Sequence, residues 1–149
     1  MRRHNNTAAG ERLPPMTKAV AGRFAGYPDA TRANLLEIRK LIFDVAANSD
    51  HTGPLIETLK WGQPAYLPIK PRIGTTVRVD ALEHRRFDYA IYVHCQTTLV
   101  ATFRHLYPDV FAFEGDRALL FANSARLPRE ALRHCLGLAL TYHLKAGRS

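Results

Sequence analysis

The spacing of apolar residues changes twice along this chain, and that change limits the folds open to it. In one segment near the start, apolar residues recur every three or four positions, which predicts an amphipathic helix. The residues of this stripe are Leu35, Ile38, Leu41, Ile42 and Val45. Between residues 55 and 121 the apolar runs are short and are interrupted by Gly and Pro, which is typical of strands. From Pro128 the helical spacing returns, so we expect helices at both ends with strands between them.

The middle of the chain contains about five to six candidate strands. They cover residues 55–61, 65–67, 76–80, 89–94, 110–113 and 118–121. Gly115-Asp116 separates the last two as a hairpin turn would, and strands do not alternate regularly with helices. We therefore predict an α+β fold, with a mostly antiparallel sheet and helices packed on one of its faces, in a single domain.

The predicted helices have local signals at their starts. Thr17 is placed to cap a short helix, and Thr97 or Thr98 to cap another. Pro128 fits near the first position of the last helix. Residues 1–15 show no apolar spacing, so we expect a disordered tail there, followed by one domain over residues 16–146.

The chain is strongly basic, with a formal net charge of +8 and a pI near 9.9. Its arginines are spread along the sequence with no Lys- and Arg-rich run, which is typical of a solvated surface. Nonspecific binding of anions or nucleic acid through surface arginines stays one alternative function. No apolar stretch is long enough for a signal sequence or a membrane span, so we expect a cytoplasmic protein without a membrane partner.

Familiar catalytic and cofactor motifs are missing from the sequence. It has no P-loop, no G-x-G-x-x-G, no G-x-S-x-G and no H-E-x-x-H. Cys95 and Cys135 do not form a C-x-x-C pair, which argues against a zinc site, and we expect both to be buried thiols. We therefore favour a protein that is not an enzyme, with no catalytic set, no metal site and no cofactor.

Several segments of the sequence resemble one family. They are Tyr27-Pro28, Arg32 to Val45, Glu57 to Tyr66, Val93 to Val100, Phe111 to Arg117 and Leu127-Pro128. On these residues the chain resembles the YdhG-like family, catalogued as domain of unknown function 1801, over nearly all of its length after the tail. The resemblance implies a bacterial α/β sandwich-like domain that is distantly similar to frataxin.

One member of that family is regarded as an iron chaperone, so the resemblance implies iron as a ligand. The residues themselves argue against it, because iron sites need several oxygen ligands together. Here carboxylates such as Asp29, Glu37, Asp44 and Glu57 are scattered along a basic chain. An intracellular iron-binding chaperone is therefore the alternative function rather than the leading one.

The segment Trp61-Gly62-Gln63-Pro64-Ala65-Tyr66 is the main candidate for a ligand site. Trp61 and Tyr66 have large apolar faces with polar tips, and the Gly and Pro between them bend the chain. A role for these aromatic residues in the core is the competing interpretation. Further candidate contacts for a small molecule are Gln63, His94, Gln96, Arg104 and Arg117.

His94 and Cys95 are adjacent at the end of a predicted strand, just before a helix. Adjacent strand residues point to opposite faces, so we do not expect this pair to act as base and nucleophile. An anion held by the backbone at the helix start, with Gln96 or Thr97, is the better interpretation.

Arg126, Arg129 and Arg133 form a second candidate anion site near the start of the last helix. A solvated basic face is the alternative for these three residues. Taken together, the sequence favours a non-enzymatic module that binds a small molecule or acts as an accessory protein, as a monomer or a homodimer.

Overall fold

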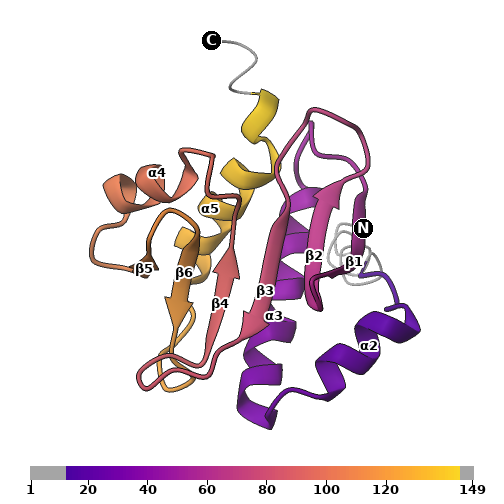
Figure 1. Cartoon of the computed structure of the whole chain (residues 1–149). Helices are drawn as coiled ribbons and strands as arrows, with labels where there is room; N and C mark the ends of the chain where they lie inside the picture. The colour runs from indigo at the N-terminus through magenta and orange to yellow at the C-terminus, as the bar shows by residue number, and fades with distance from the viewer. Residues whose placement is uncertain (1–12, 145–149) are drawn as a thin grey trace, which may run out of the picture.

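A computed structural model describes residues 13–144 of the chain (Figure 1). In chain order the elements are α2 (Lys18–Ala25), α3 (Asp29–Ala47), β1 (Leu55–Lys60), β2 (Gln63–Pro68), β3 (Val77–Ala81), β4 (Tyr89–Tyr92), α4 (Leu99–Leu106), β5 (Ala112–Glu114), β6 (Ala118–Phe121) and α5 (Arg129–Leu140). None of the helices in this part of the chain is long and apolar enough to cross a membrane. Most of the predicted tail, up to residue 12, lies outside the described residues, as do residues 145–149.

The six strands form one sheet in the order β1-β2-β3-β4-β6-β5. Every neighbouring pair is antiparallel. The β5–β6 hairpin turns at Gly115, whose φ of 54° is one that glycine adopts without strain. The predicted α+β fold with an antiparallel sheet is confirmed.

The helices and the sheet make two layers, with α3 and α5 behind the sheet in Figure 1 and the opposite face open. Fully buried apolar side chains of both helices meet the inner face of the sheet. They are Leu35, Ile38 and Ile42 of α3 and Leu132 and Leu140 of α5, packed against Tyr66, Val77 and Val79. The main core lies on this side of the sheet, and a small buried cluster of Ala90, Tyr92 and Ala118 lies on the other face, which also carries the candidate site.

Strand β3 shows how the alternation of side chains divides the two faces. Val77 and Val79 are buried in the core, whereas Arg78 and Asp80 point to the open face and are only partly buried. Because successive strand residues point to opposite sides, two charged residues on the open face follow from two valines on the inner one. These two charged residues are central to the site described below.

The predicted helix caps are found in part. Thr17 caps α2 as expected, with its hydroxyl accepting from the Val20 amide at 3.3 Å. Thr98 stands at the start of α4, but its side chain makes no capping hydrogen bond there. The side chain of Thr97 donates to the His94 carbonyl at 2.7 Å and accepts from the amide of Leu99, the first residue of α4, at 3.4 Å.

A buried ion pair joins α3 to the edge of the sheet. Arg39 donates to both carboxylate oxygens of Glu57, at 2.6 and 2.9 Å, and both side chains are less than a tenth exposed. Tyr66 donates its phenol to the same carboxylate at 2.8 Å, and burial raises the pKa of that phenol well above its ordinary value. Arg39 also donates to the Pro14 carbonyl at 2.7 Å, which holds the chain before α2. The network therefore links β1, β2, α3 and the start of the described chain.

Replacing Glu57 by Ala should destabilise the fold strongly, because it leaves the Arg39 guanidinium buried without its partner. We expect a loss of about 3–5 kcal/mol in the free energy of unfolding, measured by urea denaturation. Glu37→Ala is the matched control, since Glu37 pairs with Arg129 where both side chains are about half exposed. That control should cost at most about 1 kcal/mol. Equal losses in the two variants would contradict the importance given to the buried pair.

Candidate functional site

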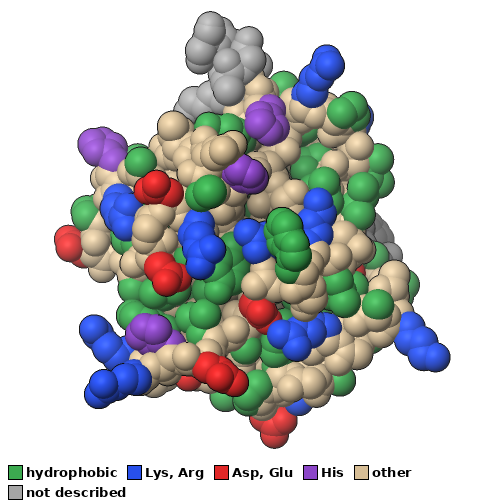
Figure 2. Space-filling view, viewed as in Figure 1, with side chains coloured by type: hydrophobic (Ala, Val, Ile, Leu, Met, Phe, Trp, Pro, Cys, Tyr) green, Lys and Arg blue, Asp and Glu red, His purple; other side chains and the backbone are tan. Residues whose placement is uncertain are grey.

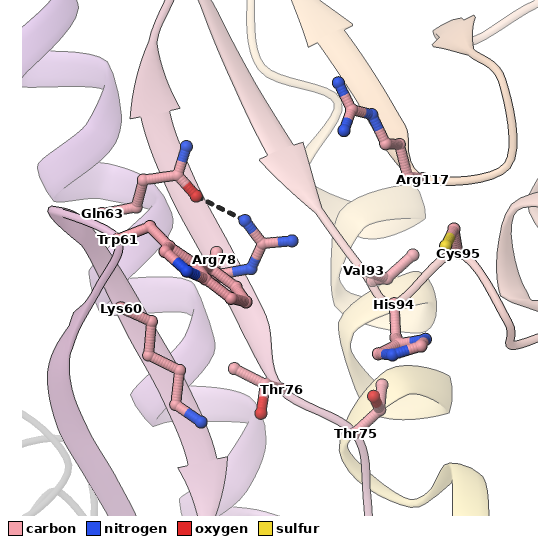
Figure 3. A pocket seen from close by; sticks show the side chains of 10 residues that line it. All are labelled: Lys60, Trp61, Gln63, Thr75, Thr76, Arg78, Val93, His94, Cys95 and Arg117. Carbon is pink, nitrogen blue, oxygen red and sulfur yellow. Dashed lines mark hydrogen bonds between the residues drawn. The ribbon is translucent and has the colours of Figure 1, made fainter.

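The open face of the sheet carries a pocket of about 500 Å³. Figure 3 shows it between the β1–β2 turn on one side and the segment after β4 on the other, with residues 75 and 76 at its base. The volume is within the range of small-molecule sites in proteins. In the view of Figure 2, basic side chains lie on both sides of a hydrophobic area in the middle of this face.

Trp61 forms one wall of the pocket from an unusual backbone conformation. It follows β1 directly and has φ of 52°, and the next residue, Gly62, has φ of 77°. Two positive φ values make the tight turn that β1 and β2 need, where Lys60 pairs with Gln63. Asn, Asp or Gly is usual in that position, and an aromatic residue there costs about 1–2 kcal/mol. The indole is nevertheless 85% exposed, so no burial in this chain offsets the strain.

Arg78 lies in the middle of the site, between two aromatic rings. Its guanidinium carbon is 5.3 Å from the ring centroid of Trp61 and 5.3 Å from that of Tyr92. The register explains the space around it, because Arg78 pairs with Ala65 on one side and Tyr92 on the other, and Tyr92 in turn pairs with Ala118. The two alanines leave room above the sheet for the arginine and the tyrosine ring.

A chain of hydrogen bonds orients Arg78. The guanidinium donates to the side-chain carbonyl of Gln63 (Figure 3). The amide nitrogen of Gln63 donates to Asp80 at 3.2 Å. Asp80 also accepts from Arg23 and from the phenol of Tyr27, both at 2.8 Å. Burial and this hydrogen bond raise the pKa of Tyr27 far above its ordinary value, so the phenol stays a donor. Arg23 of α2 and Tyr27 therefore hydrogen-bond to the Asp80 carboxylate, and the side-chain hydrogen-bond partner of Arg78 is the neutral Gln63.

The site is electropositive and has no acidic residue in its wall. Lys60, Arg78 and Arg117 line the pocket, and within residues 13–144 no carboxylate is at ion-pair distance from any of the three. Burial lowers the pKa of Arg78, and the nearby charge of Arg117 lowers it further. Both guanidinium carbons lie near the ring centroid of Tyr92, at 5.3 Å for Arg78 and 5.9 Å for Arg117, and an anion bound near them would relieve both effects.

His94 and Cys95 lie on the far side of the pocket from Trp61. The Gln96 amide donates to Nδ1 of His94 at 3.0 Å, which leaves the ring hydrogen of the neutral imidazole on Nε2. Both residues line the pocket although β4 ends at Tyr92 and strand alternation stops there, and their side chains point in different directions in Figure 3. Val93 then holds this segment beside Arg117 through a backbone hydrogen bond of 2.9 Å.

The two cysteines differ in their surroundings. Cys135 is buried as expected, and burial raises the pKa of its thiol to about 12. Cys95 is exposed, so the prediction that both are buried is wrong for this residue. It belongs to the loop after β4, which passes over the open face rather than through the core.

Four of the predicted ligand contacts meet in this pocket, namely Trp61, Gln63, His94 and Arg117. Tyr66 is fully buried in the core, where its phenol contacts Glu57. Gln96 is exposed and contributes only its backbone amide to His94. Arg104 lies on α4 with its guanidinium carbon 5.0 Å from the ring centroid of Phe113, away from the pocket lining.

Sequence reasoning missed Arg78, Lys60, Thr75, Thr76 and Cys95 as pocket residues. The alternation from Thr76 to Asp80 already indicated a strand with one wet face, and Arg78 is on that face. Its neighbours Trp61 and Tyr92, however, are 17 and 14 positions from it in sequence. Only the register of the sheet brings these three side chains together.

The second predicted anion site is largely taken up by ion pairs. Arg129 donates to Glu37 at 2.7 Å, and Arg133 donates to Asp44. Asp44 thus pairs with α5 rather than with Lys40 in its own helix, because α3 and α5 pack side by side. Arg126 is exposed and precedes the helix.

Comparison with family models, curated proteins and solved structures finds no match to this chain. Within the described part of the chain, no group of three or more His, Cys, Asp and Glu side chains is arranged to hold a metal ion.

Gly74 positions the base of the pocket through a close backbone approach. A Cβ on this residue would lie 2.1 Å from the carbonyl oxygen of Leu140, near the end of α5. The next residue, Thr75, donates its amide to the Ala139 carbonyl at 3.0 Å. The end of α5 therefore holds the segment that leads into β3.

Gly74→Ala should destabilise the protein, because the added methyl group meets main chain that has no room to move aside. We expect a loss of about 1–3 kcal/mol in the free energy of unfolding. Gly22→Ala is a control of the same chemistry in α2, where nothing lies within 4 Å of the added carbon. It should stabilise the helix by about 0.5–1 kcal/mol. Urea denaturation of the two variants compares them directly, and a stabilised Gly74→Ala would contradict the close approach.

Proposed function

We propose that this protein is a non-enzymatic module that binds a small anionic molecule in the pocket on the open face of its sheet. The observation that carries the proposal is the presence of Arg78 and Arg117 in one pocket lining, with no carboxylate of the described residues at ion-pair distance from either. Arginine presents planar donors that match carboxylate and phosphate oxygens, and such charge-assisted hydrogen bonds are the stronger kind.

The ion pairs made by other arginines of the chain support this proposal. Arg23, Arg39, Arg129 and Arg133 each pair with a carboxylate of the same chain. Arg78 is more buried than an ordinary surface arginine, yet its side-chain partner is the neutral Gln63. A partly desolvated cation without an internal counter-charge is favourable when a ligand supplies that charge.

The iron and nucleic-acid alternatives have narrower support. The iron alternative and the YdhG-like family rest on the sequence resemblance alone, and both stay predictions. The nucleic-acid alternative rests on the net charge of +8, and two of the three arginines named for it pair with carboxylates of α3. The pocket is the better-supported site because its cations have no such pairing.

Titration with methyl phosphate at low ionic strength tests the proposal. Trp61 is the only tryptophan of the chain and stands in the pocket wall, so its fluorescence should change as the site fills. Arg78→Gln should weaken binding by about 10-fold or more, because a hydrogen bond to a charged group is worth about 1.5–3 kcal/mol. Calorimetry should give the same dissociation constant.

Arg126→Gln is the matched control, since it removes the same charge from an exposed residue outside the pocket. It should change the dissociation constant by less than about twofold, as a distant surface charge is screened by salt. Absence of saturable binding to the unmodified protein, or an equal effect of the two substitutions, would refute the proposed site.

A further inference from the structure

Resting on this anion site, we infer that the ligand carries a planar aromatic ring beside a dianionic phosphate monoester. Aryl phosphates and nucleoside monophosphates share this chemistry. The inference comes from the wall opposite His94, from the number of cations and from the size of the pocket.

Trp61 is exposed and has a strained backbone conformation. Its ring is 85% exposed and its backbone is in the left-handed region, so packing within the chain does not account for an indole here. Backbone strain that local packing does not explain is often found where a ligand is held. One face of the indole lies over Arg78, and its edge borders the open pocket (Figure 3).

His94 belongs to the wall of the pocket opposite Trp61. His94 and Trp61 lie on opposite sides of the pocket in Figure 3, and both are exposed. A planar ring bound beside Trp61 can pack against the exposed part of the indole. Stacking on such surfaces is favourable for any ring with a π-face, whether a nucleobase or a phenyl group. The His94 Nε2 hydrogen adds one donor at the rim of the same wall.

The lining of the pocket carries several positive charges. Lys60, Arg78 and Arg117 bring three positive charges to the pocket lining, and no carboxylate of the described residues lies at ion-pair distance from any of them. A single carboxylate would balance one of these charges. A phosphate monoester carries close to two negative charges at neutral pH and has three acceptor oxygens. The hydroxyls of Thr75 and Thr76 are further donors at the base of the pocket.

The volume of the pocket limits the size of its ligand. A pocket of about 500 Å³ is much larger than a phosphate group alone requires, and sites of this size enclose molecules with an organic body. The apolar contribution to its wall comes from Trp61 and Val93. A ring joined to the phosphate therefore fits both the space and the surface.

Calorimetric titrations with methyl phosphate and phenyl phosphate test the inference, because the two compounds carry the same dianion and differ by the ring. The unmodified protein should bind phenyl phosphate about 10-fold more tightly than methyl phosphate. Trp61→Ala should remove that preference, because it should weaken phenyl phosphate more than methyl phosphate. Trp61→Phe should keep part of the preference, and Ile69→Ala, an exposed residue outside the pocket, should keep all of it.

The outcomes separate this inference from the proposed function. If neither phosphate binds, the anion site itself is refuted. If both bind with equal affinity, the anion site stands and the aromatic inference is overturned. A preference for phenyl phosphate that survives Trp61→Ala also overturns it. A further titration with adenosine monophosphate distinguishes the two sources, since tighter binding than phenyl phosphate indicates a nucleotide and weaker binding indicates a smaller aryl phosphate.

Circular dichroism and thermal unfolding keep the test interpretable. Trp61 makes little contact with the core, so Trp61→Ala should fold with an unchanged spectrum and a midpoint close to that of the unmodified protein. If it does not fold, Trp61→Phe alone decides the matter, because it then should weaken phenyl phosphate and not methyl phosphate. Equal weakening of both compounds by Trp61→Phe would overturn the inference.

Discussion

The partly buried charge of Arg78 is the constraint on which the open face of this protein depends. The inner face fixes the register through Val77 and Val79, and the same register places Arg78 between the rings of Trp61 and Tyr92. Burial makes that charge less favourable, and Arg117 makes it less favourable still. Core packing on one side of β3 thus produces an electropositive site on the other side.

Asp80 explains why the positive charge stays available. It is two positions from Arg78 on the same face and would be the obvious counter-ion. Instead it accepts hydrogen bonds from Arg23 and Tyr27, and Gln63 stands between it and Arg78. Helix α2 therefore neutralises the carboxylate, while Gln63 keeps the guanidinium in place without cancelling its charge.

The layers of this fold follow from local sequence patterns, whereas the site does not. Helical spacing around Ile38 and alternation around Val79 predict the elements and their buried sides, and the structure confirms both. Trp61 was found because Gly62 marks a sharp turn, but Arg78 was missed because its partner Tyr92 lies on another strand. The end of β4 at Tyr92 likewise depends on backbone pairing with β6, which no pattern within the segment reports.

The most direct test of this account is nuclear magnetic resonance of the arginine Nε–Hε groups during a titration with methyl phosphate. The account predicts that the signals of Arg78 and Arg117 move together and saturate, because both guanidinium groups contact the bound anion. Those of Arg129 and Arg133, already paired with Glu37 and Asp44, should stay in place. Shifts confined to Arg126, Arg129 and Arg133, or no shift at Arg78, would contradict it.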